Sequence, residues 1–130
     1  MKNVTIYKSA LYIHKDSRRT IEEYILPAPI PFEVKQVKLV YLKQGKMVGN
    51  HYHPIISNRW ELFISTGEVL FSYRYYTKVG ITKELLNKGD ICIIPPGYSH
   101  LFIAEDNKVC LLGMSNKIYN KDDAVVDILI

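Results

Sequence analysis

The chain has 130 residues, of which 48% are apolar and 23% charged, with 17 basic and 13 acidic side chains. This length suits one domain with a single core, so we expect one domain over residues 1–130. No apolar run reaches the ~18 residues of a membrane-spanning helix, and the first residues lack the apolar stretch of a signal peptide. The net charge of +4 is scattered along the chain, unlike the clustered charge of nucleic-acid binders. We therefore expect a cytoplasmic protein that binds neither membranes nor nucleic acids.

Short apolar segments, rich in β-branched and aromatic residues and bounded by turn formers, run along the whole chain. The predicted strands are Thr5–Ile13, Thr20–Leu26, Val34–Lys43, Lys46–His53, Trp60–Ser65, Glu68–Tyr76, Ile81–Leu86, Asp90–Ile94, His100–Ala104 and Lys108–Met114. The proline-rich segment Leu26–Pro31 predicts a crossing between an N-terminal hairpin and the barrel, and Lys121–Ile130 predicts either a short helix or a last strand. Cys92 and Cys110 fall in predicted strands without metal or redox spacing, so we expect reduced core residues. The pattern predicts an all-β sandwich or barrel.

Three of the four histidines lie in two predicted strand segments that begin with a glycine and contain a second one. In the first segment, Gly45–His53, the imidazoles of His51 and His53 stand two residues apart and so project from the same face of a strand. The second segment, Gly89–His100, delivers the third histidine after a Pro-Pro-Gly turn. Imidazoles gathered in this way bind a metal, transfer protons or hold a ligand.

These two segments resemble the two sequence motifs of the cupin superfamily. The matching residues are Gly45, His51 and His53 in the first motif and Gly89, Pro95, Gly97 and His100 in the second. The motif core thus covers residues 45–104. The resemblance implies an all-β double-stranded β-helix, also called a jelly-roll or cupin barrel, with the three histidines at its mouth.

The cupin resemblance also implies a metal-dependent alternative, in which His51, His53, Glu61 and His100 hold a divalent transition metal. Three imidazoles and one carboxylate suit Fe, Mn, Ni, Co or Zn, and this donor set does not choose among them. Glu61 lies one residue away from the position that the motif gives to its glutamate. A slip of one residue turns a strand side chain to the opposite face. Without a bulge or a shortened turn, Trp60 would then face inward and Glu61 would face solvent.

Within the cupins, the chain resembles two groups of enzymes that act on nucleotide-linked keto-sugars. The segments Asp16–Arg18, Ile30–Val37 and Leu111–Ser115, with Tyr119, Asp122 and Asp123, are similar to the dTDP-4-keto-6-deoxyhexose 3,4-ketoisomerases. The segments Gly49–Tyr52, Gly67–Val69 and Ile94–His100 are similar to the dTDP-4-dehydrorhamnose 3,5-epimerases. The resemblance implies proton transfer beside a keto group, without a required cofactor, in cell-surface polysaccharide biosynthesis.

The same resemblance implies roles for individual residues. His51 is the expected base, and His53 is its partner or the shuttle to a second carbon. A tyrosine is the expected acid, for which Tyr98, Tyr73 and Tyr119 are candidates and Tyr98 is taken as catalytic. The expected substrate-binding residues are Arg59, Arg74, His100, Tyr73 and Tyr119, and the two arginines would hold the pyrophosphate through charge-assisted bonds.

The sequence leaves three functions open. The whole-chain similarity and the insertion at Pro54–Arg59 favour a metal-independent nucleotide-sugar isomerase or epimerase. The three histidines and an available carboxylate favour a metal-dependent cupin enzyme such as a dioxygenase, isomerase or lyase. Pro54 and Trp60 replace basic residues of the two enzyme patterns, which favours a non-catalytic sugar-binding cupin. Because an open sandwich of this size has edges that need cover, we also expect a homodimer, in which the N-terminal strands could be exchanged.

Overall fold

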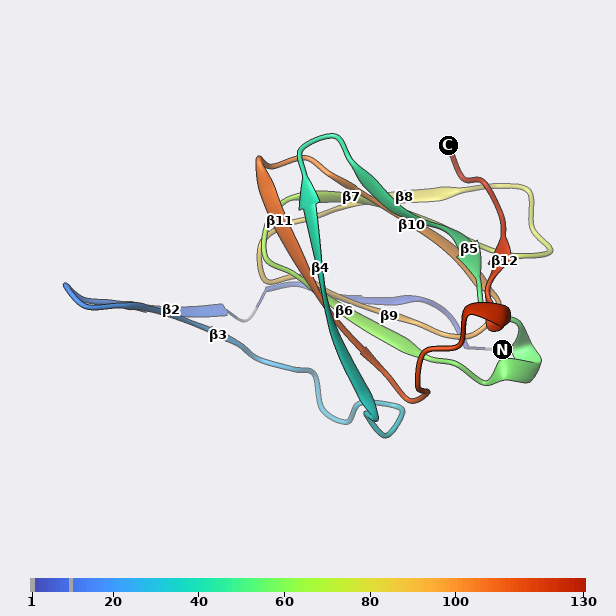
Figure 1. The fold of residues 1–130 in the computed structure, drawn as a ribbon, viewed down its shortest axis with the longest axis horizontal. Helices are drawn as coiled ribbons and strands as arrows, with labels where there is room; N and C mark the ends of the chain where they lie inside the picture. The colour runs from blue at the N-terminus through green and yellow to red at the C-terminus, as the bar shows by residue number, and fades with distance from the viewer. Residues whose placement is uncertain (1, 10) are drawn as a thin grey trace.

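The computed structural model describes residues 2–9 and 11–130, in which nearly all regular structure is β-strand (Figure 1). The strands are β1 (Thr5–Tyr7), β2 (Leu11–Lys15), β3 (Thr20–Tyr24), β4 (Gln36–Lys43), β5 (Met47–Tyr52), β6 (Glu61–Ser65), β7 (Val69–Tyr75), β8 (Thr82–Leu86), β9 (Ile91–Ile94), β10 (Tyr98–Ala104), β11 (Lys108–Ser115) and β12 (Val125–Val126). Two short 3₁₀ turns, η1 (Ile55–Ser57) and η2 (Lys121–Asp123), complete the described elements. Among the described residues, none belongs to a helix that is long and apolar enough to cross a membrane.

Two five-stranded antiparallel sheets form the body of the molecule. Their strand orders are β1-β9-β6-β11-β4 and β12-β5-β10-β7-β8. Between β4 and β11, every connection except the β7–β8 hairpin passes from one sheet to the other, which is the jelly-roll topology. The expected all-β jelly-roll fold of the cupin type is confirmed.

The core fills the space between the two sheets with side chains from alternate strand positions. Phe63, Phe71 and Phe102 lie at its centre, and the rings of Phe71 and Phe102 stack with centroids 4.8 Å apart. A second apolar cluster covers the outer face of the first sheet, where Leu62 and its neighbours lie beneath the chain that leaves β3. That covering chain includes Leu26–Pro31, which forms no strand, as predicted.

The N-terminal strand prediction is wrong in one respect. The predicted single strand Thr5–Ile13 is two strands, of which β1 pairs with β9 in the body while β2 pairs with β3 in a separate hairpin. Between β1 and β2, the backbone N–H of Ser9 donates to the Asp90 carboxylate at 2.8 Å instead of to a neighbouring strand. Figure 1 shows the β2–β3 hairpin extending away from the body. The segment Lys121–Ile130 contains both a short 3₁₀ turn and a last strand.

A bulge in β5 aligns the two histidine segments. The register between β5 and β10 shifts beside His100, where Asn50 adopts a left-handed φ of 60°. Gly49 has a φ of 118°, and a Cβ at this position would collide with the backbone oxygen of His100. Only glycine fits this conformation and this close approach.

Replacing Gly49 with alanine is therefore expected to lower the free energy of unfolding by at least ~2 kcal/mol, because strain and a backbone clash add. Urea denaturation of Gly49→Ala would measure the loss. Gly80→Ala is the matched control, since a Cβ at Gly80 would meet no atom within 4 Å. Equal stabilities of the two variants would contradict this account of the bulge.

Candidate active site

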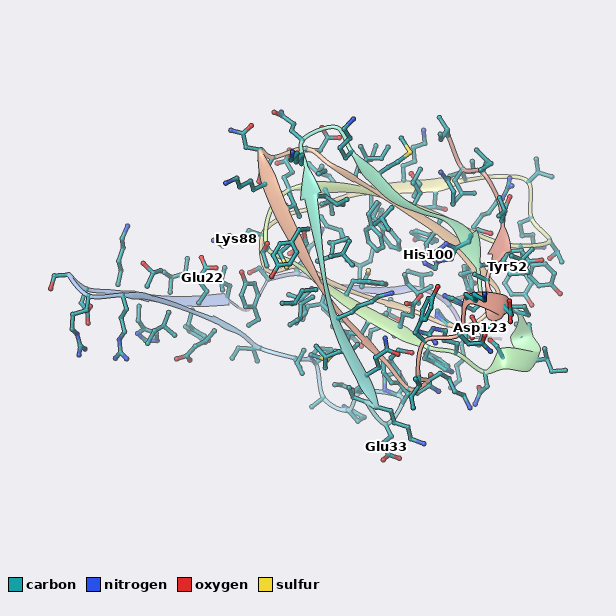
Figure 2. All side chains as sticks on the ribbon, viewed as in Figure 1. Glu22, Glu33, Tyr52, Lys88, His100 and Asp123 are labelled. Atoms are coloured by element: carbon teal, nitrogen blue, oxygen red, sulfur yellow. The ribbon has the colours of Figure 1, made fainter. Side chains whose placement is uncertain are left out.

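The candidate site lies at one end of the barrel, where several strands deliver polar side chains to the interior. The contributing residues are Lys38 from β4, His51 and His53 from β5 and the residue that follows it, Glu61 from β6, His100 from β10 and Asp123 from η2. His51 lies opposite His100 in the β5–β10 ladder. Figure 2 shows His100 and Asp123 at this end of the molecule.

The structure brings the three motif histidines together. The ring centroids of His51 and His100 lie 4.8 Å apart, those of His51 and His53 lie 5.2 Å apart, and those of His53 and His100 lie 6.1 Å apart. One ring nitrogen from each histidine lies within 4.8 Å of the others. Three imidazoles at this spacing can share protons or hold one small ligand.

Glu61 faces the barrel interior rather than solvent, and its side chain is only 3% exposed. Its Oε1 atom lies 3.2 Å from His53 Nε2 and 3.5 Å from His100 Nε2. Its Oε2 atom accepts a hydrogen bond from Lys38 Nζ at 3.3 Å. Glu61 is therefore the central carboxylate of the site.

The connection between β5 and β6 explains how Glu61 reaches the interior. The extra residues form η1, and Asn58 closes it in the left-handed conformation with a φ of 51°. This turn absorbs the one-residue offset, so that β6 begins with Glu61 facing inward. Trp60 instead packs near Phe32 in the outer cluster, with ring centroids 6.2 Å apart. The register in which Trp60 faces inward does not occur.

Surrounding cations keep Glu61 ionised. Burial alone would raise the pKa of this carboxyl, but contact with His53 and the nearby Lys38 ammonium hold the pKa well below its ordinary range. The Oε1 atom has no well-aligned hydrogen bond from the described residues. Glu61 thus presents one negative oxygen directly to the histidine cluster.

His53 and His51 have opposite protonation tendencies. His53 Nδ1 lies 2.7 Å from Asp123 Oδ1, and its Nε2 faces Glu61. Burial lowers the pKa of His53, but the two carboxylates outweigh burial and raise it. Burial and the neighbouring His53 lower the pKa of His51. His53 therefore holds a proton more readily than the neighbouring His51, as a proton donor and a proton acceptor require.

His100 is the most buried of the three histidines, and its ring orientation is fixed. The backbone oxygen of Tyr98 accepts a hydrogen bond from His100 Nδ1 at 3.1 Å. Burial lowers the pKa of His100 to about 4, so this imidazole is neutral at pH 7. Its Nε2 then carries a lone pair that points toward Glu61.

The lowered pKa of His100 predicts a loss of stability in acid. Between its ordinary pKa of 6.5 and about 4, the unfolded chain binds a proton that the folded chain does not, so stability falls as the pH drops through this window. Between pH 7 and pH ~4.5, we expect the free energy of unfolding to fall by about 2 kcal/mol more in wild type than in His100→Gln, as measured by urea denaturation. His14→Gln, on the exposed hairpin, is the control and should keep the wild-type pH dependence. Parallel profiles for His100→Gln and wild type would refute the prediction.

The two predicted phosphate-binding arginines are already engaged. Arg59 is 2% exposed, and its Nη1 donates to the backbone oxygen of Ile118 at 3.2 Å and lies 3.9 Å from Asp123 Oδ2. Arg74 lies on β7 and binds Asp127 through Nη2 at 2.6 Å and Nε at 3.3 Å. Their expected contact with pyrophosphate stays a prediction, which would require these ion pairs to open.

The predicted tyrosines lie in two different places. The Tyr98 hydroxyl donates to Asn3 Oδ1 at 3.0 Å, and its ring lies near Tyr73 with centroids 6.4 Å apart. Burial raises the pKa of both of these phenols. Tyr119 is 69% exposed, in the segment before η2. Their roles as acid or substrate contacts stay predictions.

Sequence reasoning missed Lys38 and gave Asp123 no role. Lys38 occupies an inward position on β4, and its Nζ lies 5.4 Å from the centre of the Phe63 ring, besides its contact with Glu61. The alternation of β4 was the available signal for Lys38, because every second side chain of that strand faces inward. Asp123 lies seventy residues from His53 in the sequence, so only the fold reveals their contact.

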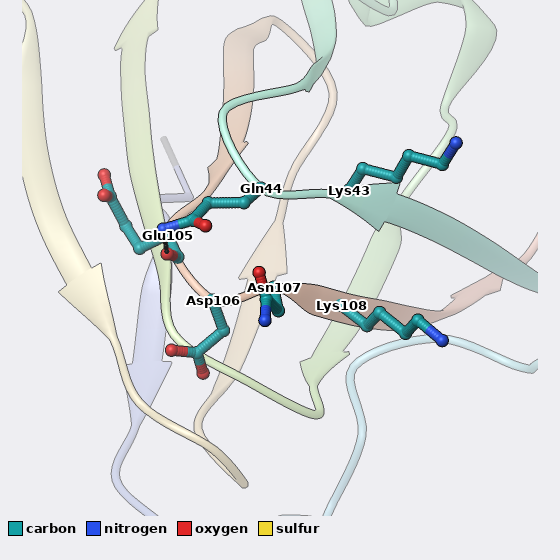
Figure 3. Close-up of a pocket in the computed structure, with 6 residues that line it drawn as sticks. All are labelled: Lys43, Gln44, Glu105, Asp106, Asn107 and Lys108. Atoms are coloured by element: carbon teal, nitrogen blue, oxygen red, sulfur yellow. Dashed lines mark hydrogen bonds between the residues drawn. The ribbon is translucent and has the colours of Figure 1, made fainter.

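A separate hollow lies at the opposite end of the barrel (Figure 3). Its walls are the β4–β5 and β10–β11 turns, with lining residues Lys43, Gln44, Glu105, Asp106, Asn107 and Lys108. None of the three clustered histidines lines it.

Several solved structures with this fold are epimerases and ketoisomerases that act on nucleotide-linked sugars, although no family model and no curated protein matches the chain by sequence. A dTDP-4-dehydrorhamnose 3,5-epimerase from Bacillus anthracis is 13% identical with a TM-score of 0.77, and the match covers 98% of this chain and 79% of that one. A 3,4-ketoisomerase from Helicobacter canadensis is 18% identical with a TM-score of 0.75, covering 98% and 92%. A TDP-fucose-3,4-ketoisomerase from Campylobacter jejuni is 18% identical with a TM-score of 0.70, covering 97% and 90%. At these identities, the similarity establishes the shared fold.

Proposed function

We propose that the chain is a nucleotide-sugar isomerase or epimerase that transfers protons beside a keto group without a metal. One observation carries the proposal: inside the barrel, His53, which contacts the carboxylates of Glu61 and Asp123, lies beside His51, whose pKa burial and His53 lower. A base and an acid held side by side are what enolisation and reprotonation need.

In the proposed reaction, His51 removes the proton from the carbon next to the ketone. The electrons of the broken C–H bond move into the carbonyl group to form an enolate, and His53 supplies a proton as the enolate collapses. Asp123 and Glu61 favour the protonated form of His53 before the transfer. The Lys38 ammonium, whose side chain is 40% exposed, can stabilise the negative oxygen of the enolate.

The substrate class is proposed from the neighbours. The Bacillus anthracis epimerase structure has TDP and pyrophosphate bound, and a related epimerase from Legionella pneumophila has dTDP-4-keto-L-rhamnose bound. A dTDP-linked 4-keto-6-deoxyhexose is accordingly the proposed substrate, in polysaccharide biosynthesis. Both cysteines are free, which fits the reducing cytoplasm as the proposed location.

The test is solvent deuterium uptake by a dTDP-4-keto-6-deoxyhexose, followed by proton NMR in D₂O with chelator-treated protein. The proposal predicts uptake at a carbon next to the keto group at an unchanged rate after chelation. No uptake, with substrate binding retained, would overturn the proposal and favour a sugar-binding protein. Uptake that chelation abolishes would favour a metal-dependent enzyme.

A second candidate function is a metal-dependent reaction, favoured by the buried Glu61 Oε1 atom that lacks an aligned hydrogen bond. His51, His53, His100 and Glu61 would hold the ion, and this donor set fits Fe, Mn, Ni, Co or Zn. Asp123 would orient His53 from outside the site. A bound ion would act as a Lewis acid on a substrate oxygen. Elemental analysis of the purified protein should find stoichiometric metal under this candidate function and none under the first.

We further propose a homodimer in which a second copy covers the projecting hairpin. An isolated two-stranded hairpin is marginally stable, and Tyr12 and Ile13 on β2 are 61% and 54% exposed. The β4 edge strand also exposes an apolar stripe at Val37, Leu39 and Tyr41. Light scattering after size exclusion should give twice the chain mass of 15.1 kDa for wild type. A Leu39→Glu variant should shift toward monomer, and a monomeric wild type would overturn the proposal.

A further inference from the structure

The C-terminal segment from Asp123 to Leu129, here called the C-terminal strap, runs along β5 between the catalytic end and the outer face of the second sheet. Its first residue contacts His53 at 2.7 Å, and its centre, β12, pairs with β5 at Tyr52 and His51. Its last residue, Leu129, is fully buried. The strap therefore joins the site to a distant point on the same sheet.

The bulge in β5 holds the strap by two hydrogen bonds. The backbone N–H of Asp127 donates to the backbone oxygen of Asn50 at 2.8 Å, and the N–H of Leu129 donates to Asn50 Oδ1 at 2.9 Å. The bulge that aligns His51 with His100 is thus also the docking point of the strap.

A charged anchor fixes the strap on the outer face. The Asp127 carboxylate accepts hydrogen bonds from Arg74 Nη2 at 2.6 Å and Nε at 3.3 Å, and from the Ser99 hydroxyl. Arg74 and Ser99 are opposite each other in the β7–β10 ladder, on the face away from Tyr98 and His100. Arg74 Nη1 also donates to the backbone oxygen of Val79 at 3.2 Å, so its guanidinium is held on two sides.

By contrast, the turn that carries Asp123 has few supports of its own. η2 is three residues long and contains no buried residue. Asn120 caps it locally through the N–H of Asp122, and Arg59 approaches Asp123 Oδ2 at only 3.9 Å. On the N-terminal side, Arg59 Nη1 donates to the backbone oxygen of Ile118. The position of Asp123 therefore depends on this contact and on what holds the chain on its C-terminal side.

We propose that Asp127 is a positioning residue, whose bonds to Arg74 and Ser99 hold the strap so that Asp123 orients His53. The Arg74 and Asp127 side chains are 20% and 18% exposed, and partly exposed ion pairs contribute modestly to stability. The effect of breaking this pair should therefore fall mainly on the site. Its effect on turnover rests on the proposed proton-transfer function. The contact between His53 and Asp123 can be measured without any turnover.

The test is the downfield proton NMR signal of His53 Nδ1–H in its hydrogen bond to Asp123. Wild type should show this signal, and Asp127→Asn should lose it while its near-UV circular dichroism stays native. Asp127→Glu should restore the signal. Asp122→Asn removes one negative charge from η2 itself, beside Asp123. It is the matched control and should keep the His53 signal.

On a dTDP-4-keto-6-deoxyhexose, Asp127→Asn should lower kcat roughly tenfold or more with little change in KM, because misplacement of a catalytic group reduces the chemical step. If Asp127→Asn does not fold, Arg74→Gln replaces it in the same experiment. Retention of the His53 signal in either folded variant would overturn the proposal. If the variant loses the His53 signal but wild type shows no turnover, the positioning role of Asp127 is supported and the proposed function is rejected.

Discussion

Replacing His51 with glutamine is expected to slow solvent deuterium uptake by a dTDP-4-keto-6-deoxyhexose about a thousandfold. His51 is the imidazole whose pKa burial and the neighbouring His53 lower, so it is neutral and able to accept a proton at pH 7. Glutamine retains hydrogen bonding but cannot act as a base in this pH range. The measurement is the disappearance of the proton signal next to the keto group in D₂O.

Two controls accompany this prediction. His14→Gln changes an exposed histidine on the hairpin and should keep the wild-type rate. Binding of TDP to His51→Gln should remain close to wild type, which would show that the loss is chemical. A His51→Gln variant with most of the wild-type rate would refute the role of His51 as the base.

Replacing Glu61 with glutamine is expected to shift the alkaline limb of the pH–rate profile to lower pH. The acid must be protonated, so the rate falls as the pH rises through the pKa of His53. Glu61 raises that pKa through direct contact, and glutamine removes the negative charge while keeping the shape. At neutral pH the rate should fall as a result, because a smaller fraction of His53 is protonated.

The matched control for Glu61→Gln is Glu33→Gln, which removes a carboxylate from an exposed position (Figure 2). Its alkaline limb should coincide with that of wild type. An unshifted limb in Glu61→Gln would contradict the assignment of His53 as the acid. Loss of bound metal in Glu61→Gln would instead support the metal-dependent candidate function.

The barrel could be predicted from the sequence because its strands carry local signals. In Phe71–Tyr75, aromatic side chains alternate with polar ones, and Gly89 and Gly97 mark turns with positive φ. The end of β1 could not be predicted in this way. A contact between Ser9 and Asp90, 81 residues apart, ends it, and no local pattern reports such a contact.

The site was predictable only in part, for the same physical reason. The alternation within Gly45–His53 placed two histidines on one face, but the direction of Glu61 depended on η1 and on a left-handed Asn58. Asparagine tolerates the left-handed conformation, but its presence in a sequence does not by itself predict that conformation. Arg59 and Arg74 resembled free cations because their partners, Asp123 and Asp127, come from the far end of the chain.

The most direct test of His51 as the base and His53 as the acid is the protonation state of each imidazole ring. Nitrogen-15 NMR of chelator-treated protein at pH 7 reports whether each imidazole nitrogen carries a proton. The geometry predicts that both nitrogens of His53 are protonated between Asp123 and Glu61, whereas His51 keeps one unprotonated nitrogen. A charged His51 beside a neutral His53 would contradict the proposed assignment of base and acid.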